Sequence, residues 1–141
     1  MQPTFNFTLG VDPHAREVVV QGLLAYNFEQ MGRSNTYDDF ELYARDERGE
    51  LVGGMFGQSG MGWMYIDYLW LQGDQRGNGL GAQLIAQAET EARRRGCVGV
   101  FLYTYSFQAP VFYEKQGFER MGVLEDCPPG HQRIYLKKHF G

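Results

Sequence analysis

The sequence predicts a mixed α/β fold in which a central sheet of six to seven strands carries helices on both faces. Short runs rich in β-branched and aromatic residues recur along the chain and indicate strands. Segments with apolar residues at helical spacing separate some of these runs. A glycine-rich turn follows the longest apolar run. The chain has 141 residues, of which 43% are apolar and 15% aromatic. We therefore expect one domain over residues 1–141, with a hydrophobic core of its own.

The expected elements are short and are joined by polar, glycine-containing turns. In chain order, they are a strand at 4–9, a helix at 13–28, a polar loop at 30–38, strands at 40–45, 51–58 and 63–71, a helix from residue 80 to about residue 95, a strand at 98–105, a helix at 110–116, and strands at 118–124 and 132–137. The first strand rests on alternating apolar and polar residues. The first helix rests on Asp12 and Pro13, which are typical of an N-cap and a first helical position.

The middle of the chain is expected to form a hairpin followed by the central strand of the sheet. Residues 46–49 indicate the turn of the hairpin. Gly53 and Gly54, in its second strand, indicate a bulge or a close neighbour. Residues 63–71 are apolar or aromatic throughout except for Asp67, which favours a buried central strand.

The second half of the chain has the clearest helical pattern. Leu80, Leu84, Ile85, Ala88 and Ala92 recur at helical spacing. Three arginines then stand where the helix dipole favours cations, and a glycine ends the helix. A continuous apolar strand, a short helix that begins with a proline, and a final hairpin complete the fold.

Charge and cysteine content exclude several classes of protein. The net charge of −4 argues against a nucleic-acid binder that relies on a basic patch. The sequence contains no window of 18 apolar residues, so no membrane span is predicted. The first residues lack the pattern of a signal peptide. Cys97 and Cys127 make no disulfide framework, so we expect reduced thiols in a cytoplasmic protein. The histidines and cysteines lack metal-ligand spacing, so no metal is expected.

The most informative segment is the glycine-rich turn at 76–81, which follows the 63–71 strand and opens the second helix. Glycines let a ligand approach the backbone, and the free N–H groups of a first helical turn attract an anion such as pyrophosphate. A P-loop would need Lys and Ser or Thr after its glycine, but Leu80 follows Gly79. A dinucleotide fingerprint lies near the first strand and has an acidic residue about 20 positions later. Neither pattern is present here.

Two motifs together resemble the GNAT superfamily of acyl-CoA N-acyltransferases, in particular its small bacterial single-domain members. Arg76, Gly79 and Gly81 match the superfamily's coenzyme A-binding pattern Gln/Arg-x-x-Gly-x-Gly/Ala. Residues 109–118, Ala-Pro-Val-Phe-Tyr-Glu-Lys-Gln-Gly-Phe, match its later signature Ala-x-x-x-Tyr-x-Lys-x-Gly-Phe. The two motifs have the superfamily's order and separation, and the order of elements fits along the whole chain.

The resemblance implies a cytoplasmic N-acetyltransferase that binds acetyl-CoA in a V-shaped gap between the strands at 63–71 and 98–105. The residues that it implies for coenzyme binding are Leu69, Trp70, Leu71, Arg76, Gly77, Asn78, Gly79, Leu80 and Gly81. Many members have Asn where this chain has Ser106, so this hydroxyl or Gln108 would take its place. The oligomeric state stays open, a homodimer included.

Tyr113 and Asp67 are the expected catalytic residues. The resemblance places Tyr113 beside the coenzyme A sulfur, where its phenol would protonate the leaving thiolate. Alternation puts Tyr65, Asp67, Leu69 and Leu71 on one side of their strand, so we expect Asp67 to deprotonate or bind an incoming amine. A structural Asp that caps a turn or pairs with an arginine is the alternative. Tyr65 is expected to orient a water molecule.

We expect the acceptor to be the primary amine of a small molecule, because the net negative charge of the chain favours a small cationic amine over an acidic peptide. The resemblance implies that the first helix and the loop at 26–38 wall the acceptor site. Two alternatives stay open. One is acetylation of a protein N-terminus or lysine, which predicts an open groove. The other is a non-catalytic acyl-CoA-binding module, against which the presence of Tyr113 argues.

Overall fold

The structure, a computed structural model, describes residues 2–33 and 36–141, and the chain forms two compact units, Met1–Asn35 and Thr36–Gly141. None of the described helices is long and apolar enough to cross a membrane. The second unit contains the glycine-rich turn, the strand with Asp67 and the helix with Tyr113. All the expected catalytic and coenzyme-binding residues therefore belong to this unit.

The described part of the first unit, residues 2–33, contains one helix, α1 (Pro13–Met31). Its start is as predicted, since the Asp12 carboxylate accepts a hydrogen bond from the amide of Ala15 at 3.0 Å. Its end lies beyond the predicted residue 28, at Gly32, which adopts the left-handed conformation with φ 70°. The strand predicted at 4–9 is wrong, because these residues form no regular structure. Alternating apolar residues give a segment one apolar face, but a strand also needs a partner strand for its backbone, and no strand is present among residues 2–33.

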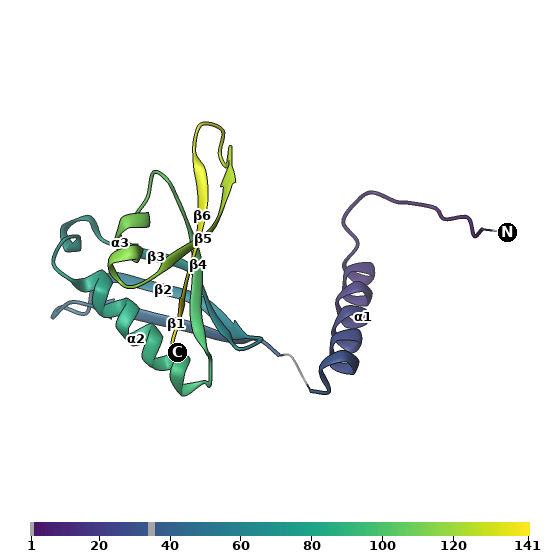
Figure 1. The fold of residues 1–141 in the computed structure, drawn as a ribbon, viewed down its shortest axis with the longest axis horizontal. Helices are drawn as coiled ribbons and strands as arrows, with labels where there is room; N and C mark the ends of the chain where they lie inside the picture. Colours follow the sequence, from purple (N-terminus) through teal and green to yellow (C-terminus); the bar gives the residue numbers. More distant parts are fainter. Residues whose placement is uncertain (1, 34–35) are drawn as a thin grey trace. The chain divides into compact units, whose positions relative to one another are not determined.

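The second unit is a six-stranded mixed sheet with two helices (Figure 1). Its elements are β1 (Asp38–Arg45), β2 (Leu51–Gly60), β3 (Trp63–Leu71), the 3₁₀ turn η1 (Gly73–Gln75), α2 (Leu80–Arg94), β4 (Gly99–Tyr105), α3 (Pro110–Lys115), β5 (Glu119–Glu125) and β6 (Gln132–His139). The strand order is β1-β2-β3-β4-β6-β5, in which only β3 and β4 run parallel. The predicted mixed α/β class and the central position of the 63–71 strand are confirmed.

Helix α2 packs on one face of this sheet (Figure 1). Its buried residues are those that the helical spacing predicts, together with one glycine: Gly81, Leu84, Ile85, Ala88 and Ala92. They join a core cluster to which the strands contribute Met55, Met64, Ile66, Val100, Leu102 and other apolar residues. Packing of this amphipathic face fixes the N-terminus of α2 next to the end of β3.

The two glycines predicted to mark a bulge or a close neighbour in β2 mark close neighbours. A Cβ atom on Gly53 would lie 2.9 Å from the side chain of Leu71, and one on Gly54 would lie 2.7 Å from the ring of Tyr43. Larger side chains at these positions would therefore push β2 away from its neighbours.

The bulge lies farther along the β2–β3 ladder, at Asp67. Gly57 pairs with Ile66 and the preceding residue of β2 pairs with Tyr68, which leaves Asp67 as the extra residue of β3. Gly57 faces the bulge: a Cβ atom there would collide with the backbone carbonyl of Tyr65 and lie 3.0 Å from the amide nitrogen of Asp67. The bulge therefore depends on a glycine in the neighbouring strand.

The bulge corrects the predicted faces of β3. Leu69 and Leu71 pack against the core that α2 covers, whereas Tyr65 packs on the opposite face, against Phe101 with ring centroids 4.9 Å apart. Asp67 lies on the side of Tyr65, because the residue before it, Ile66, is buried in the core and Asp67 itself is exposed. The predicted alignment of Asp67 with Leu69 and Leu71 is wrong, since an inserted residue reverses the alternation beyond it.

The two parallel strands separate directly after the bulge. β3 and β4 pair from Trp63 and Gly99 as far as Ile66 and Leu102, although both strands continue for several residues. The predicted V-shaped gap between them is thus present, with backbone edges of both strands facing it.

Candidate active site

A cleft of about 830 Å³ occupies the region where β3 and β4 separate. Its lining comes from the ends of both strands, the glycine-rich turn, the start of α2, and α3 with the residues before it. Of the residues singled out from the sequence, it contains Asp67, Leu69, Trp70, Leu71, Arg76, Gly77, Gly79, Gly81, Gln108 and Tyr113. The fold therefore brings the two sequence motifs together around one cavity.

The glycine-rich turn presents free backbone N–H groups to this cleft. Gly79 caps α2 in the left-handed conformation with φ 88°, which glycine adopts without strain. The Asn78 side-chain oxygen accepts a hydrogen bond from the Leu80 amide at 3.2 Å. Of the remaining N–H groups in the first turn, those of Gly81 and Ala82 belong to residues that line the cleft. An anion beside them would meet these groups and the positive end of the helix dipole.

Gly81 also serves packing, because a Cβ atom there would lie 3.0 Å from the ring of Phe112. This close contact joins α2 to α3 and explains why Gly81 is buried while Gly79 is exposed. A side chain at Gly79 would meet no protein atom within 4 Å. Glycine is therefore required for different reasons at the two positions: at Gly79 by the left-handed backbone, and at Gly81 by the close contact with Phe112.

Tyr113 lies in α3, with its ring packed between those of Phe112 and Phe118 at centroid distances of 5.1 and 5.9 Å. The side chain is 8% exposed and lines the cleft. Burial raises the pKa of Tyr113 to about 12, so the phenol is protonated at neutral pH. No described residue forms a hydrogen bond with its hydroxyl. The hydroxyl is thus a protonated donor free to bind a ligand atom in the cleft.

Ser106 and Gln108 have different positions. The Ser106 hydroxyl accepts a hydrogen bond from the Gln132 amide at 3.0 Å, which ties the end of β4 to the start of β6, and Ser106 lies outside the cleft lining. The Gln108 side-chain oxygen accepts bonds from the Thr104 hydroxyl (3.1 Å) and the Tyr105 amide (2.9 Å). Of the two expected substitutes for Asn, Gln108 lines the cleft and Ser106 does not. Asn78 and Leu80 also lie outside the lining and support the turn.

Asp67 is exposed and lines the cleft at the bulge. Within residues 36–141 it pairs with no arginine or lysine and caps no turn, so neither structural alternative raised from the sequence is observed. Burial, and then the charge of Asp67, raise the pKa of Tyr65 to about 12. Tyr65 therefore stays protonated and is unsuited to act as a base at neutral pH.

A row of tyrosines continues from Tyr65 across the sheet face opposite α2. Tyr103 and Tyr105 of β4 lie 5.7 Å apart by ring centroids, and Tyr135 of β6 lies 5.7 Å from Tyr103. The Arg133 guanidinium lies over this row, 4.4 Å from the centroid of Tyr103. Sequence reasoning missed this cluster, although Tyr alternates with other residues in β4 in the pattern of one sheet face.

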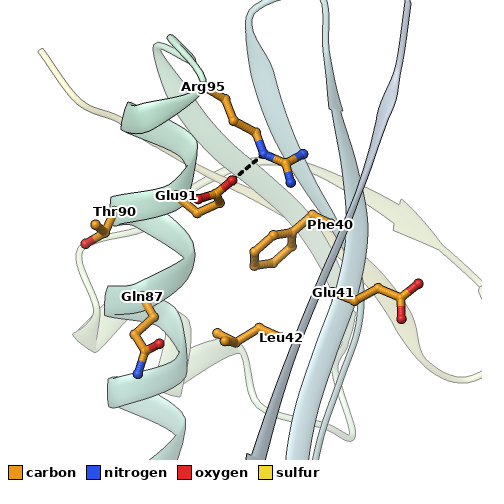
Figure 2. Close-up of a pocket in the computed structure, with 7 residues that line it drawn as sticks. All are labelled: Phe40, Glu41, Leu42, Gln87, Thr90, Glu91 and Arg95. Atoms are coloured by element: carbon orange, nitrogen blue, oxygen red, sulfur yellow. Dashed lines mark hydrogen bonds and ion pairs between the residues drawn. The ribbon is translucent and has the colours of Figure 1, made fainter.

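A second hollow, of about 360 Å³, lies between α2 and β1 on the opposite side of the sheet from these tyrosines. Figure 2 shows Phe40 and Leu42 directed toward α2 and Arg95 paired with Glu91, with 2.7 Å between nitrogen and oxygen. Arg95 also donates to the Ser59 hydroxyl and to two backbone carbonyls of β1. These polar groups satisfy one another, so the hollow joins the edge strand to α2. Among the described residues, no group of acidic, His or Cys side chains could hold a metal ion.

Comparison with known proteins agrees with this geometry. The sequence model of the Acetyltransferase (GNAT) family matches residues 11–118, which include both motifs. This chain belongs to the GNAT acetyltransferase family. As a GNAT acetyltransferase it is an acetyl-CoA-dependent acyltransferase, and the expected fold and enzyme class are confirmed.

Individual relatives support the same assignment to the GNAT family. The chain is 45% identical over 102 residues to a blasticidin-S acetyltransferase of Streptomyces morookaense, an alignment that covers 72% of this chain and 75% of that protein. A crystal structure of an acetyltransferase from Bacillus cereus superposes with a TM-score of 0.87, 29% identity, and coverage of 95% of this chain and 97% of that one. A Bacillus anthracis structure, described as a candidate streptothricin acetyltransferase in complex with acetyl coenzyme A, has a TM-score of 0.68, 25% identity, and coverage of 74% and 64%.

Proposed function

We propose that this GNAT enzyme transfers the acetyl group of acetyl-CoA to the primary amine of a small molecule, by direct attack of the amine in a ternary complex. The observation that carries the proposal is that the glycine-rich turn, Asp67 and Tyr113 line one and the same cleft. A catalytic module is favoured over a simple acyl-CoA-binding one because a protonated phenol and a carboxylate line the same cavity.

The residues of the cleft fit coenzyme A. Its volume of about 830 Å³ lies within the usual range for small-molecule sites. In our proposal Arg76, Gly77 and Gly79, with the N–H groups of Gly81 and Ala82, hold the pyrophosphate. The open edge of β3 at Leu69, Trp70 and Leu71 offers backbone partners to the pantetheine amides. Gln108 acts at the far side of the cleft, while Asn78, Leu80 and Ser106 support this frame through their own hydrogen bonds.

The thioester supplies an activated acetyl group, and three groups of the protein act on the transfer. Asp67 binds the incoming ammonium and takes its first proton, directly or through a water that Tyr65 orients; the second proton leaves the nitrogen as the C–S bond breaks and restores the proton that Tyr113 gives to the sulfur. A backbone N–H on the open edge near Leu69 or Trp70 stabilises the negative charge that develops on the carbonyl oxygen. Tyr113 donates its hydroxyl proton toward the leaving sulfur, and burial keeps that proton in place.

A small-molecule acceptor is supported by the relative that is named for acetylating blasticidin S. The family match covers parts of both units, so we propose that residues 1–141 serve as one acetyltransferase domain. Both cysteines are free thiols, in keeping with a cytoplasmic enzyme. A homodimer is the assembly that we would test first, by light scattering. Residues 34–35 of the segment expected to wall the acceptor site lie outside the described residues.

A screen of amines with acetyl-CoA, monitored by release of free thiol, tests the proposed function. The panel holds blasticidin S, streptothricin, aminoglycosides, polyamines, amino acids and a lysine-containing peptide. We expect turnover of at least one small amine and none of the peptide. Preference for the peptide would show a protein acetyltransferase, and binding of acetyl-CoA without turnover of any amine would show a non-catalytic module.

The glycine-rich turn gives a matched pair of variants. Gly79→Asp and Gly79→Asn have side chains of the same shape, both tolerate the left-handed conformation better than other residues, and both enter open space. Asp also favours a helix N-terminus, so the free protein should keep its stability. We expect Gly79→Asp to weaken acetyl-CoA binding, measured by calorimetry, by about tenfold or more relative to Gly79→Asn, because it adds a negative charge beside the pyrophosphate. Equal affinities of the two variants would place the pyrophosphate elsewhere.

A further inference from the structure

Arg133 forms no ion pair with any residue of 36–141. Within residues 36–141, no carboxylate lies within ion-pair distance of its guanidinium, whereas other arginines of this unit, such as Arg95 and Arg120, pair with glutamates. Its Nη2 donates to the Tyr105 hydroxyl at 2.9 Å and its Nη1 to the Tyr135 hydroxyl at 3.5 Å. Its Nε is buried and has no hydrogen-bond partner. A guanidinium has five N–H donors, so one further N–H on each of Nη1 and Nη2 remains without a partner.

The guanidinium is held in place by aromatic rings. It lies 4.4 Å from the ring centroid of Tyr103 and 5.4 Å from that of Tyr105. β4 and β6 pair Tyr105 directly with Arg133, so the ring platform and the cation belong to one rigid ladder. An oriented, weakly hydrated guanidinium that lacks a carboxylate of its own is suited to bind a carboxylate from a ligand.

This cation stands behind two residues of the cleft wall. Arg133 is not itself part of the lining, but Tyr103 and Tyr105, which it contacts, line the cleft together with Asp67. Burial raises the pKa of Tyr103, and this shift is opposed by Arg133 and reinforced by Asp67, so the phenol lies within the fields of both charges. α2, which opens with the glycine-rich turn, packs on the other face of the sheet, so the coenzyme pyrophosphate is not the anion that Arg133 meets.

We propose that Arg133 binds an anionic group, in the first instance a carboxylate, on the same acceptor whose amine is acetylated. The acceptor class would then be amino-acid-like molecules, with the ammonium at Asp67 and the carboxylate at Arg133. Asp67 and Arg133 stand on strands separated by β4 alone and are offset by about two residues along the sheet, which puts their backbones roughly 12 Å apart or more. After allowance for one hydrogen bond at each end, a spacer of a few bonds remains between the two ligand groups.

The inference rests on the proposed acetyl transfer, and an ester comparison tests it separately. Amino acids and dipeptides are assayed as free carboxylates and as methyl esters, with wild type, Arg133→Gln and Arg133→Lys. We expect wild type to prefer the carboxylates by about tenfold or more in kcat/KM, and Arg133→Gln to lower kcat/KM for carboxylates by about 10- to 100-fold with esters nearly unchanged. Arg133→Lys should restore part of the difference, because it keeps the charge but loses the planar fork.

Arg120→Gln is the matched control, since it removes the same charge from the neighbouring strand β5. It should keep the carboxylate preference. Acetyl-CoA affinity, measured by calorimetry, should be unchanged in every variant and reports on folding. Equal slowing of carboxylates and esters by Arg133→Gln would show that Arg133 only supports the sheet, and a wild-type preference for esters would also overturn the inference. Failure of wild type to acetylate any amine would instead contradict the proposed function, and the inference with it.

Discussion

Replacement of Tyr113 by Phe is expected to slow acetyl transfer by about 10²-fold while the fold and the affinity for acetyl-CoA are kept. The change removes one hydroxyl from a ring that is packed between two phenylalanines, so little volume is lost. A general acid usually contributes about 10²–10⁴ in rate. We expect the lower end of that range here, because the raised pKa makes Tyr113 a weak acid.

The size of this effect follows from the two pKa values. Tyr113 has a pKa of about 12, and an ordinary thiol has one of about 8.5, so complete proton transfer to the thiolate is uphill by roughly 3.5 units, or about 5 kcal/mol. The phenol therefore acts mainly by donating a charge-assisted hydrogen bond to the sulfur as it leaves, with the proton following late. This hydrogen bond forms only as the sulfur leaves, so we expect Tyr113→Phe to lower kcat and to leave the affinity for acetyl-CoA unchanged.

The measurement is kcat with an amine found in the screen, under conditions in which chemistry limits turnover. Tyr43→Phe is the control, because it removes a phenol hydroxyl in β1 that bonds only to Glu41. The pH profile adds a second check. Because burial raises the pKa of Tyr113, wild-type kcat should show no decline up to about pH 10. An unchanged rate in Tyr113→Phe, or a decline of the wild-type rate near neutral pH, would assign the acid to another group.

Features that depend on neighbouring residues along the chain could be predicted from the sequence. The glycine-rich turn, helix α2 and the segment around Tyr113 each carry their signal within a few residues, and the structure places them as expected. The strand proposed at residues 4–9 shows the limit of such reasoning. Its alternation is real, but a strand exists only where another strand completes its hydrogen bonds.

The parts of the site that could not be predicted depend on contacts between strands far apart in sequence. The bulge at Asp67 is set by its pairing with β2, so alternation along β3 alone gives the wrong face for Leu69 and Leu71. Arg133 is surrounded by tyrosines of β4, more than 25 positions away in the chain. Its sequence neighbourhood is an ordinary strand start, and only the sheet register reveals an unpaired cation beside the cleft.

Gly57→Ala is expected to be the most destabilising small substitution in the sheet. The added methyl group would collide with the Tyr65 carbonyl and approach the Asp67 amide, both of which are backbone atoms that cannot turn aside. Relief requires β2 to move away from β3 or the bulge to be lost. We expect the free energy of unfolding, measured with a denaturant, to fall by about 2–4 kcal/mol.

Gly122→Ala is the matched control, because Gly122 lies in strand β5 and a Cβ atom there would meet nothing within 4 Å. Its stability should stay within about 1 kcal/mol of wild type. The same change at Gly57 should also weaken acetyl-CoA binding in whatever fraction remains folded, since loss of the bulge at Asp67 would let β3 and β4 continue their pairing and close the cleft. If Gly57→Ala matches Gly122→Ala in both stability and coenzyme affinity, the bulge does not depend on a glycine opposite it, and the opening of the two parallel strands must have another cause.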